Sequence, residues 1–113
     1  MLGEQALVGP PTSKLEKAII RRLGQLHHEG ELDESSVDCR ASFFAPTGFS
    51  LGDRVLDSLD IVEIIVTLEV DFGVDLVEAH DIATFDSISK LCVLLEQITQ
   101  PAARAEFERL WCT

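Results

Sequence analysis

Ser58 is the residue of this chain whose type and position most invite chemistry, because its hydroxyl group stands at the head of a strongly patterned segment, residues 57–72. A serine hydroxyl becomes a nucleophile when a neighbouring base takes its proton. The sequence places no histidine or lysine beside Ser58 to form such a pair. If Ser58 reacts, its activation must therefore come from a partner.

Metal chemistry has weaker support in the sequence. His27 and His28 are adjacent in the last turn of a predicted first helix, where they compensate the helix dipole, and no third ligand is in sight. The acids at positions 71, 75, 78 and 81 lack the alternating oxygen ligands of a calcium loop, which leaves a weak surface cation site at most. We therefore predict no dedicated metal site.

Residues 57–72 are predicted to form a helix with one buried face. Asp57 and Ser58 are both good N-cap residues, and Asp60 stands three places after Asp57, as in a capping box. The apolar residues whose helical spacing turns them toward a core are Ile61, Ile64, Ile65, Leu68 and Phe72. This helix should be the central element of the fold.

The same helix carries a second apolar stripe, offset from the first. It consists of Leu59, Val62, Val66 and Val70, and Ser58 lies on the arc between the two stripes. The acids Asp60, Glu63 and Asp71 fill much of the remaining surface, and Glu69 lies among the second stripe. A small monomer needs one buried face, so an acid-edged second stripe indicates a docking surface for a basic partner with an apolar centre.

These residues resemble a known family. The run Asp57-Ser58-Leu59-Asp60, followed by Val62-Glu63, Leu68-Glu69 and Phe72, is similar to the second helix of acyl carrier proteins, and the resemblance covers roughly residues 14–98. It implies that Ser58 carries a 4′-phosphopantetheine arm, transferred from coenzyme A by a phosphopantetheinyl transferase. The arm would hold acyl groups as thioesters, and the chain itself would not be an enzyme.

The resemblance also implies which residues contact partner enzymes that load, transfer or condense acyl groups. Those that match charged contacts to basic patches are Asp57, Asp60, Glu63 and Glu69, and those that match apolar contacts are Leu59, Val62 and Val66. Val55-Leu56 replaces a glycine-alanine pair that often precedes the serine, and Val70 replaces an acid. These departures favour a specialised lipid or polyketide pathway over general fatty-acid synthesis.

Three alternatives remain at the level of the sequence. An aminoacyl group is a second cargo class, and an acidic helical adaptor that is never modified would keep the same docking surface. A small serine hydrolase is disfavoured, because the nucleophile elbow and the catalytic triad are missing.

The 113 residues suffice for one domain, which we divide into a flexible tail (1–11), a carrier domain (12–100) and a C-terminal extension (101–113). Ser13 and Glu16 form a capping box for the first helix. A long connection without period follows from residue 30 to 57, then a short turn over 78–84 with Ile82 and Phe85 inward, a helix over 88–98, and a further helix up to Trp111. The expected fold is all-α, a bundle of three main helices and one short helix.

Charge and cysteine usage suggest where the protein works. The net charge is −11, and residues 31–100 hold 15 acids against three bases, which argues against nucleic acid and anionic membrane as partners. Cys39, Cys92 and Cys112 are an odd, scattered set with no zinc spacing, typical of a reducing compartment. No leader or apolar run of about 18 residues is seen. We expect a cytoplasmic monomer.

Overall fold

The central helix begins where the sequence predicts. In the computed structural model, which describes residues 9–28 and 30–112, α2 (Ser58–Phe72) follows the N-cap Asp57. The Asp57 carboxylate accepts a hydrogen bond from the Asp60 amide (2.9 Å), and the Asp60 carboxylate accepts one from the Asp57 amide (3.2 Å). α1 (Lys14–His27) begins with the predicted Ser13/Glu16 capping box.

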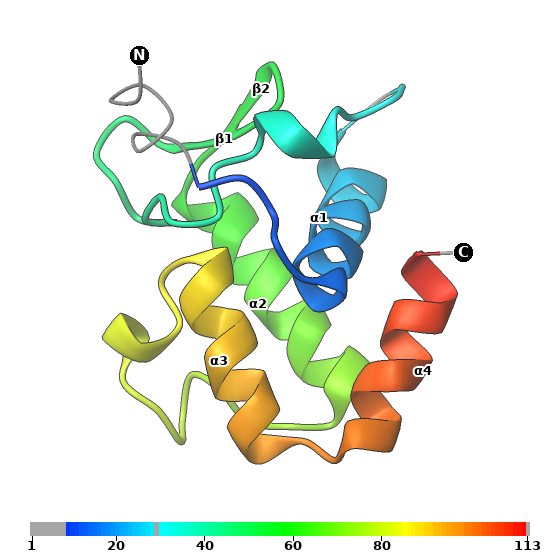
Figure 1. Ribbon diagram of the computed structural model, residues 1–113. Helices are drawn as coiled ribbons and strands as arrows, with labels where there is room; N and C mark the ends of the chain where they lie inside the picture. Colours follow the sequence, from blue (N-terminus) through cyan, green and yellow to red (C-terminus); the bar gives the residue numbers. More distant parts are fainter. Residues whose placement is uncertain (1–8, 29, 113) are drawn as a thin grey trace.

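Over the described residues, four α-helices form the framework of the fold (Figure 1). α3 (Ile88–Ile98) and α4 (Pro101–Trp111) join α1 and α2, and the short 3₁₀ turns are η2 (Glu34–Ser36) and η3 (Ile82–Thr84). The mostly helical architecture agrees with the predicted fold class. A small antiparallel sheet of β1 (Phe49–Leu51) and β2 (Arg54–Leu56) was not predicted.

The core forms between α1, α2 and α3. All five residues of the first stripe of α2 are buried, as predicted, and they pack with the apolar faces of α1 and α3. Phe43 is buried too, with its ring centroid 5.0 Å from that of Phe49, whereas Phe44 is half-buried. The connection between α1 and α2 therefore closes one end of the core.

Residues 30–57, predicted to be a long connection without period, contain the unpredicted hairpin of β1 and β2. Phe49 pairs with Leu56, Ser50 with Val55 and Leu51 with Arg54, and Gly52 between them adopts a φ of 65°. A positive φ at the first residue of a two-residue hairpin turn favours glycine. Since each strand has three residues, neither is long enough for an alternating pattern to be recognised.

Two further expectations can be compared with the structure. Phe85 is buried as predicted, but Ile82 is exposed, because a single 3₁₀ turn presents only one side to the core. Of the predicted N-terminal tail, residues 1–8 lie outside the described residues. Gly9 is attached to the segment near Cys39: its amide donates to Asp38 Oδ1 and its carbonyl accepts from the Cys39 amide.

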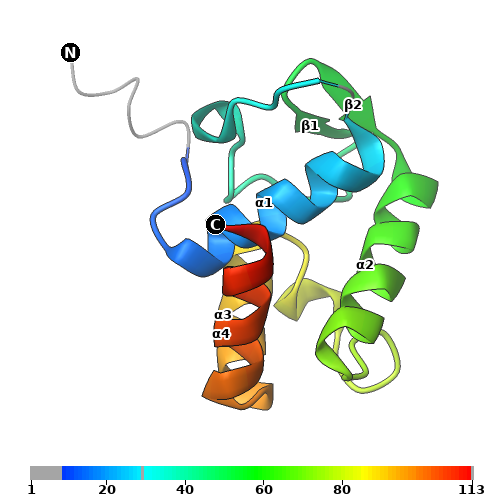
Figure 2. The ribbon, with the colours of Figure 1, turned by 90° about the vertical axis from the view of Figure 1, so that its right-hand side faces the viewer.

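The C-terminal extension is a helix that packs on the bundle. Figure 2 shows the C-terminal end of α4 beside α1, and α4 also contacts α2. Phe107 is buried, with its ring centroid 4.5 Å from that of Phe72 at the end of α2. The Arg22 guanidinium lies 4.9 Å above the Trp111 ring and binds the Asp71 carboxylate of α2 through two hydrogen bonds. The extension is therefore part of the fold.

None of the helices in the described part of the chain combines the length and the apolar character needed to cross a bilayer.

Candidate functional site

Ser58 is exposed and does not cap the helix. The cap is Asp57, so the Ser58 hydroxyl is not engaged with the first turn of α2. Within residues 9–28 and 30–112, the hydroxyl group has no hydrogen-bond partner, and no histidine or lysine contacts it. The sequence left both residues open as the cap, and the structure assigns the cap to Asp57.

The second stripe of α2 is exposed along its whole length. Leu59 is 78% exposed and Val70 is 77% exposed, with Val62 and Val66 about half exposed between them. In the described part of the chain no other element covers these four side chains. We call Leu59, Val62, Val66 and Val70 the exposed stripe. It begins next to Ser58, because Leu59 is the following residue.

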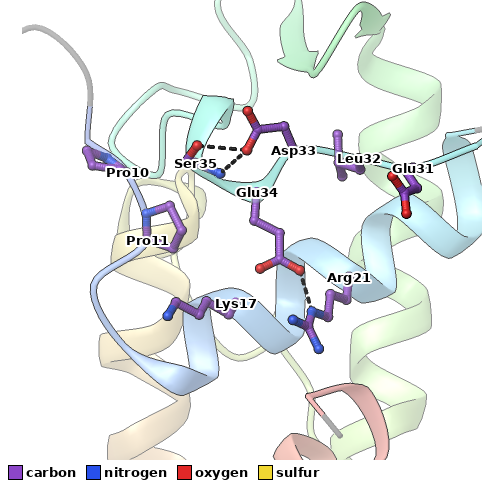
Figure 3. Close-up of a pocket in the computed structure, with 9 residues that line it drawn as sticks. All are labelled: Pro10, Pro11, Lys17, Arg21, Glu31, Leu32, Asp33, Glu34 and Ser35. Atoms are coloured by element: carbon purple, nitrogen blue, oxygen red, sulfur yellow. Dashed lines mark hydrogen bonds and ion pairs between the residues drawn. The ribbon is translucent and has the colours of Figure 1, made fainter.

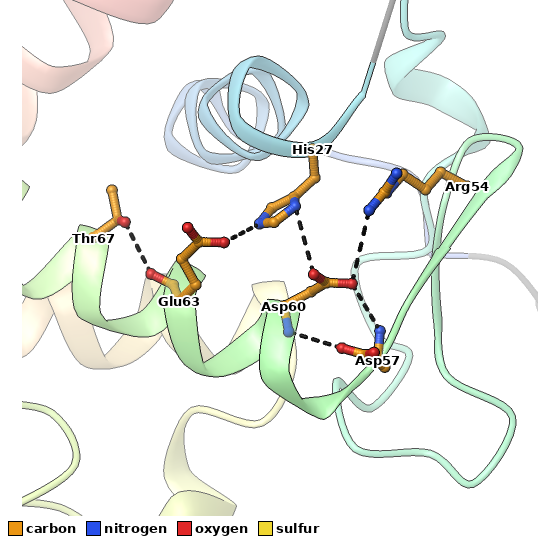
Figure 4. A network of polar contacts seen from close by, with 6 residues as sticks. All are labelled: His27, Arg54, Asp57, Asp60, Glu63 and Thr67. Atoms are coloured by element: carbon orange, nitrogen blue, oxygen red, sulfur yellow. Dashed lines mark hydrogen bonds and ion pairs between the residues drawn. The ribbon is translucent and has the colours of Figure 1, made fainter.

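Two of the predicted partner-binding acids face α1. His27 lies between them, as Figure 4 shows: Glu63 Oε1 is 3.0 Å from His27 Nε2, and Asp60 Oδ1 is 3.8 Å from His27 Nδ1. The other oxygen of Asp60 accepts the capping hydrogen bond and lies 4.0 Å from Arg54 Nη2. This cluster could not be predicted from the sequence, since it depends on how α1 crosses α2.

Glu69, the predicted acid farthest along α2, has a structural role. Glu69 Oε2 accepts hydrogen bonds from the backbone amides of Leu76 (2.7 Å) and Val77 (3.1 Å), and so holds the loop that follows α2. The carboxylate is turned away from the acids near Ser58. Of the four predicted acids, the structure thus gathers Asp57, Asp60 and Glu63 at the N-terminal half of α2 and separates Glu69 from them.

A shallow pocket opens beside Ser58. It has a volume of about 370 Å³, and it is lined by residues 43–48 of the connection together with Val55, Leu56, Asp57 and Ser58. The strand β2 and the turn around Pro46 place this pocket at the helix start. It offers a mixed polar and apolar surface to any group attached to Ser58.

A larger hollow lies between α1 and η2 and does not include Ser58 (Figure 3). Pro10, Pro11 and Lys17 form one side of it. Its second cation, Arg21, is paired with Glu34. Because that pairing neutralises much of the local charge, the hollow is a poor candidate for binding an anion.

The two buried cysteines, Cys39 and Cys92, are unsuited to nucleophilic chemistry. Burial raises the pKa of the Cys39 thiol to about 12, and the negative charges of Glu16 and Asp38 add to this effect. Burial likewise raises the pKa of Cys92. Since the thiolate is the reactive form, both thiols should be inert at neutral pH.

Comparisons of this chain with protein-family models, with curated proteins and with solved structures found no match.

Proposed function

We propose that this protein is an acyl carrier, with a 4′-phosphopantetheine arm on Ser58 that presents thioester-bound acyl groups to partner enzymes. The observation that carries the proposal is that Asp57 caps α2, which leaves the adjacent Ser58 hydroxyl exposed and without a hydrogen-bond partner among the described residues. A serine that only terminated the helix would use its oxygen as the cap.

The attachment step requires a partner because Ser58 has no base of its own. In the transferase reaction, the Ser58 oxygen would attack the phosphorus that bears the pantetheine group of coenzyme A. The bond from that phosphorus to the nucleotide half breaks, so that 3′,5′-ADP leaves, and a base of the transferase takes the serine proton. The chain's own contribution is to hold the hydroxyl exposed and fixed at the start of a rigid helix.

The exposed stripe supplies the apolar part of the docking surface. Leu59, Val62 and Val66 follow Ser58 along one side of α2, and Asp57 and Glu63 flank them. A partner with an apolar centre and a basic rim fits this arrangement, since opposite charges speed encounter and fix the orientation of the complex. Transferases and acyl-loading, acyl-transferring or synthase enzymes would share this surface in turn.

A modification assay tests the proposal. The full chain is incubated with a broad-specificity phosphopantetheinyl transferase, coenzyme A and Mg²⁺, and its intact mass is measured. We expect the mass to rise by one phosphopantetheine group, and Ser58→Ala to abolish the gain while folding normally, because the cap is Asp57. Ser50→Ala, which alters an exposed serine of β1, is the matched control and should be modified like the native chain.

Two results would contradict the carrier function. One is a gain of mass in Ser58→Ala, and the other is no gain in the native chain under conditions in which the transferase modifies another carrier. The second result would favour the unmodified adaptor, because the exposed stripe would then bind partners without any attached group.

A further inference from the structure

The side chain of His27 occupies an unusual position at the end of α1. It is 9% exposed, and its ring is directed toward two carboxylates of α2, those of Asp60 and Glu63 (Figure 4). Although Glu63 Oε1 is 3.0 Å away, Nε2 makes no hydrogen bond in the described structure. A buried ring nitrogen without a partner is costly, and its presence calls for an explanation.

We infer that His27, Asp60 and Glu63 form a binding site for one divalent transition-metal ion such as Zn²⁺. Each residue offers one ligand atom, and these three atoms all lie within 4.8 Å of one another. Zinc binds imidazole nitrogen and carboxylate oxygen at about 2.0–2.2 Å, which places the ligand atoms of a tetrahedral site about 3.4 Å apart. A small inward movement of the ligands closes the site, and water fills the remaining positions.

The two carboxylates of the site differ in how freely they can move. Glu63 is the mobile one, with a side chain that is 63% exposed. Asp60 is held by its second oxygen, which accepts from the Asp57 amide and faces Arg54, so its first oxygen stays directed at His27. Fixing a ligand through its other atoms is how proteins orient metal-binding groups.

The chemistry of the ligands indicates which ions fit. Calcium and magnesium favour sites made only of oxygen ligands. A site with one imidazole and two carboxylates suits Zn²⁺ and its neighbours in the transition series better. This site is separate from the acids at positions 71, 75, 78 and 81, and it does not depend on whether Ser58 is modified.

Metal titration of the full chain tests the inference. Zn²⁺ binding is measured by calorimetry, and Co²⁺ binding is followed by its visible absorption, which reports the ligands. We expect one equivalent to bind, with Glu63→Gln weakening the affinity about tenfold or more and His27→Gln weakening it at least as much. Glu63→Gln is the decisive variant, because residue 63 is exposed and its substitution should leave the fold intact.

Matched controls separate this site from other potential ligands. His80→Gln changes a histidine outside the cluster, and Cys112→Ser removes the one cysteine that the described structure does not bury. Both should bind Zn²⁺ like the native chain. The inference is overturned if the native chain takes up no metal, or if uptake survives Glu63→Gln and His27→Gln unchanged. In either case, His27 would only join α1 to α2.

Discussion

The carboxylate of Glu16 has two structural roles in this protein. Glu16 was predicted to complete a capping box, and it does so by accepting hydrogen bonds from Ser13 and Thr12. Its second oxygen also accepts from Ser89 Oγ of α3 at 3.2 Å, so that one carboxylate fixes the start of α1 and joins it to α3. Glu16 is one of the few buried polar residues among those described. The sequence could not reveal the second role, because Ser89 is 73 residues away.

The charge of Glu16 should make the fold sensitive to acid. Burial alone would raise its pKa, but the hydrogen bonds from Thr12, Ser13 and Ser89 lower the pKa below 4.5, the ordinary value. A group whose pKa is lower in the folded state stabilises that state above its unfolded pKa, and the contribution is lost as the pH falls through the folded value.

Glu16→Gln should therefore lower the free energy of unfolding by about 1–3 kcal/mol at neutral pH, as expected for hydrogen bonds to a charged group. The difference between the two proteins should shrink as the pH falls below 4.5. Denaturant unfolding across this pH range measures it. Glu78→Gln, which alters an exposed acid, should change the free energy of unfolding little at any pH. If Glu16→Gln lowers the free energy of unfolding by the same amount at every pH, the role assigned to the Glu16 charge is contradicted.

At the scale of the element, α2 is a helix with two apolar sides, of which one is buried and the other is exposed. The buried side was predictable residue by residue, since a 15-residue helix gives its period several repeats. The exposed stripe was predictable for the same reason. What the pattern could not predict is which helix covers which edge, so the contact of His27 with Asp60 and Glu63 appears only once α1 is placed.

Prediction from the period of apolar residues fails for the shorter elements. Ile82 was predicted to face inward together with Phe85, yet η3 is one turn long and has no period to test. The strands β1 and β2 are equally short, and their hairpin depends on pairing between strands and on Gly52. Local pattern predicts long elements well, whereas elements of three residues are decided by tertiary contacts.

Substitutions on the two sides of α2 should behave in opposite ways. Leu68 is fully buried, so Leu68→Ala should lower the free energy of unfolding by about 2–5 kcal/mol through lost burial and a cavity. Val62 is 53% exposed, so Val62→Asp should change it by less than about 1 kcal/mol. Thermal and denaturant melts of both variants check the stability difference.

The same pair of variants also bears on the proposed function. Val62→Asp should slow modification of Ser58 by the transferase, because it places a charge in the apolar centre of the docking surface. If Val62→Asp unfolds the protein as severely as Leu68→Ala, the exposed stripe belongs to the core. If it folds and is modified at the native rate, this stripe is not where the transferase binds.

The whole molecule carries its negative charge unevenly. Residues 53–81 contain nine acids and one base, Arg54. Two ion pairs neutralise part of this charge: Arg22 binds Asp71, and Arg54 lies near Asp60. The crowding of acids was predictable from the sequence. Their partners, Arg22 of α1 and Arg54 of β2, could be assigned only once the fold was known.

The size of the molecule, relative to the screening length of the solution, determines how many of its acids repel one another. Its principal extents are 39, 31 and 29 Å. The screening length of the solution is about 30 Å at 0.01 M salt, so every acid then interacts with nearly every other. At 0.15 M it is about 8 Å, and only neighbouring charges interact.

We therefore expect the thermal midpoint to rise by about 5 °C when NaCl is raised from about 0.01 to 0.15 M, equivalent to roughly 1 kcal/mol of relieved repulsion. A chelator is included so that no bound metal contributes. The exposed acids Asp75, Glu78 and Asp81 allow a direct control. Their joint replacement by Asn, Gln and Asn should raise the midpoint at low salt and reduce its response to NaCl. A native midpoint that stays constant or falls with salt would mean that attractive pairs such as Arg22–Asp71 outweigh the repulsion among the acids.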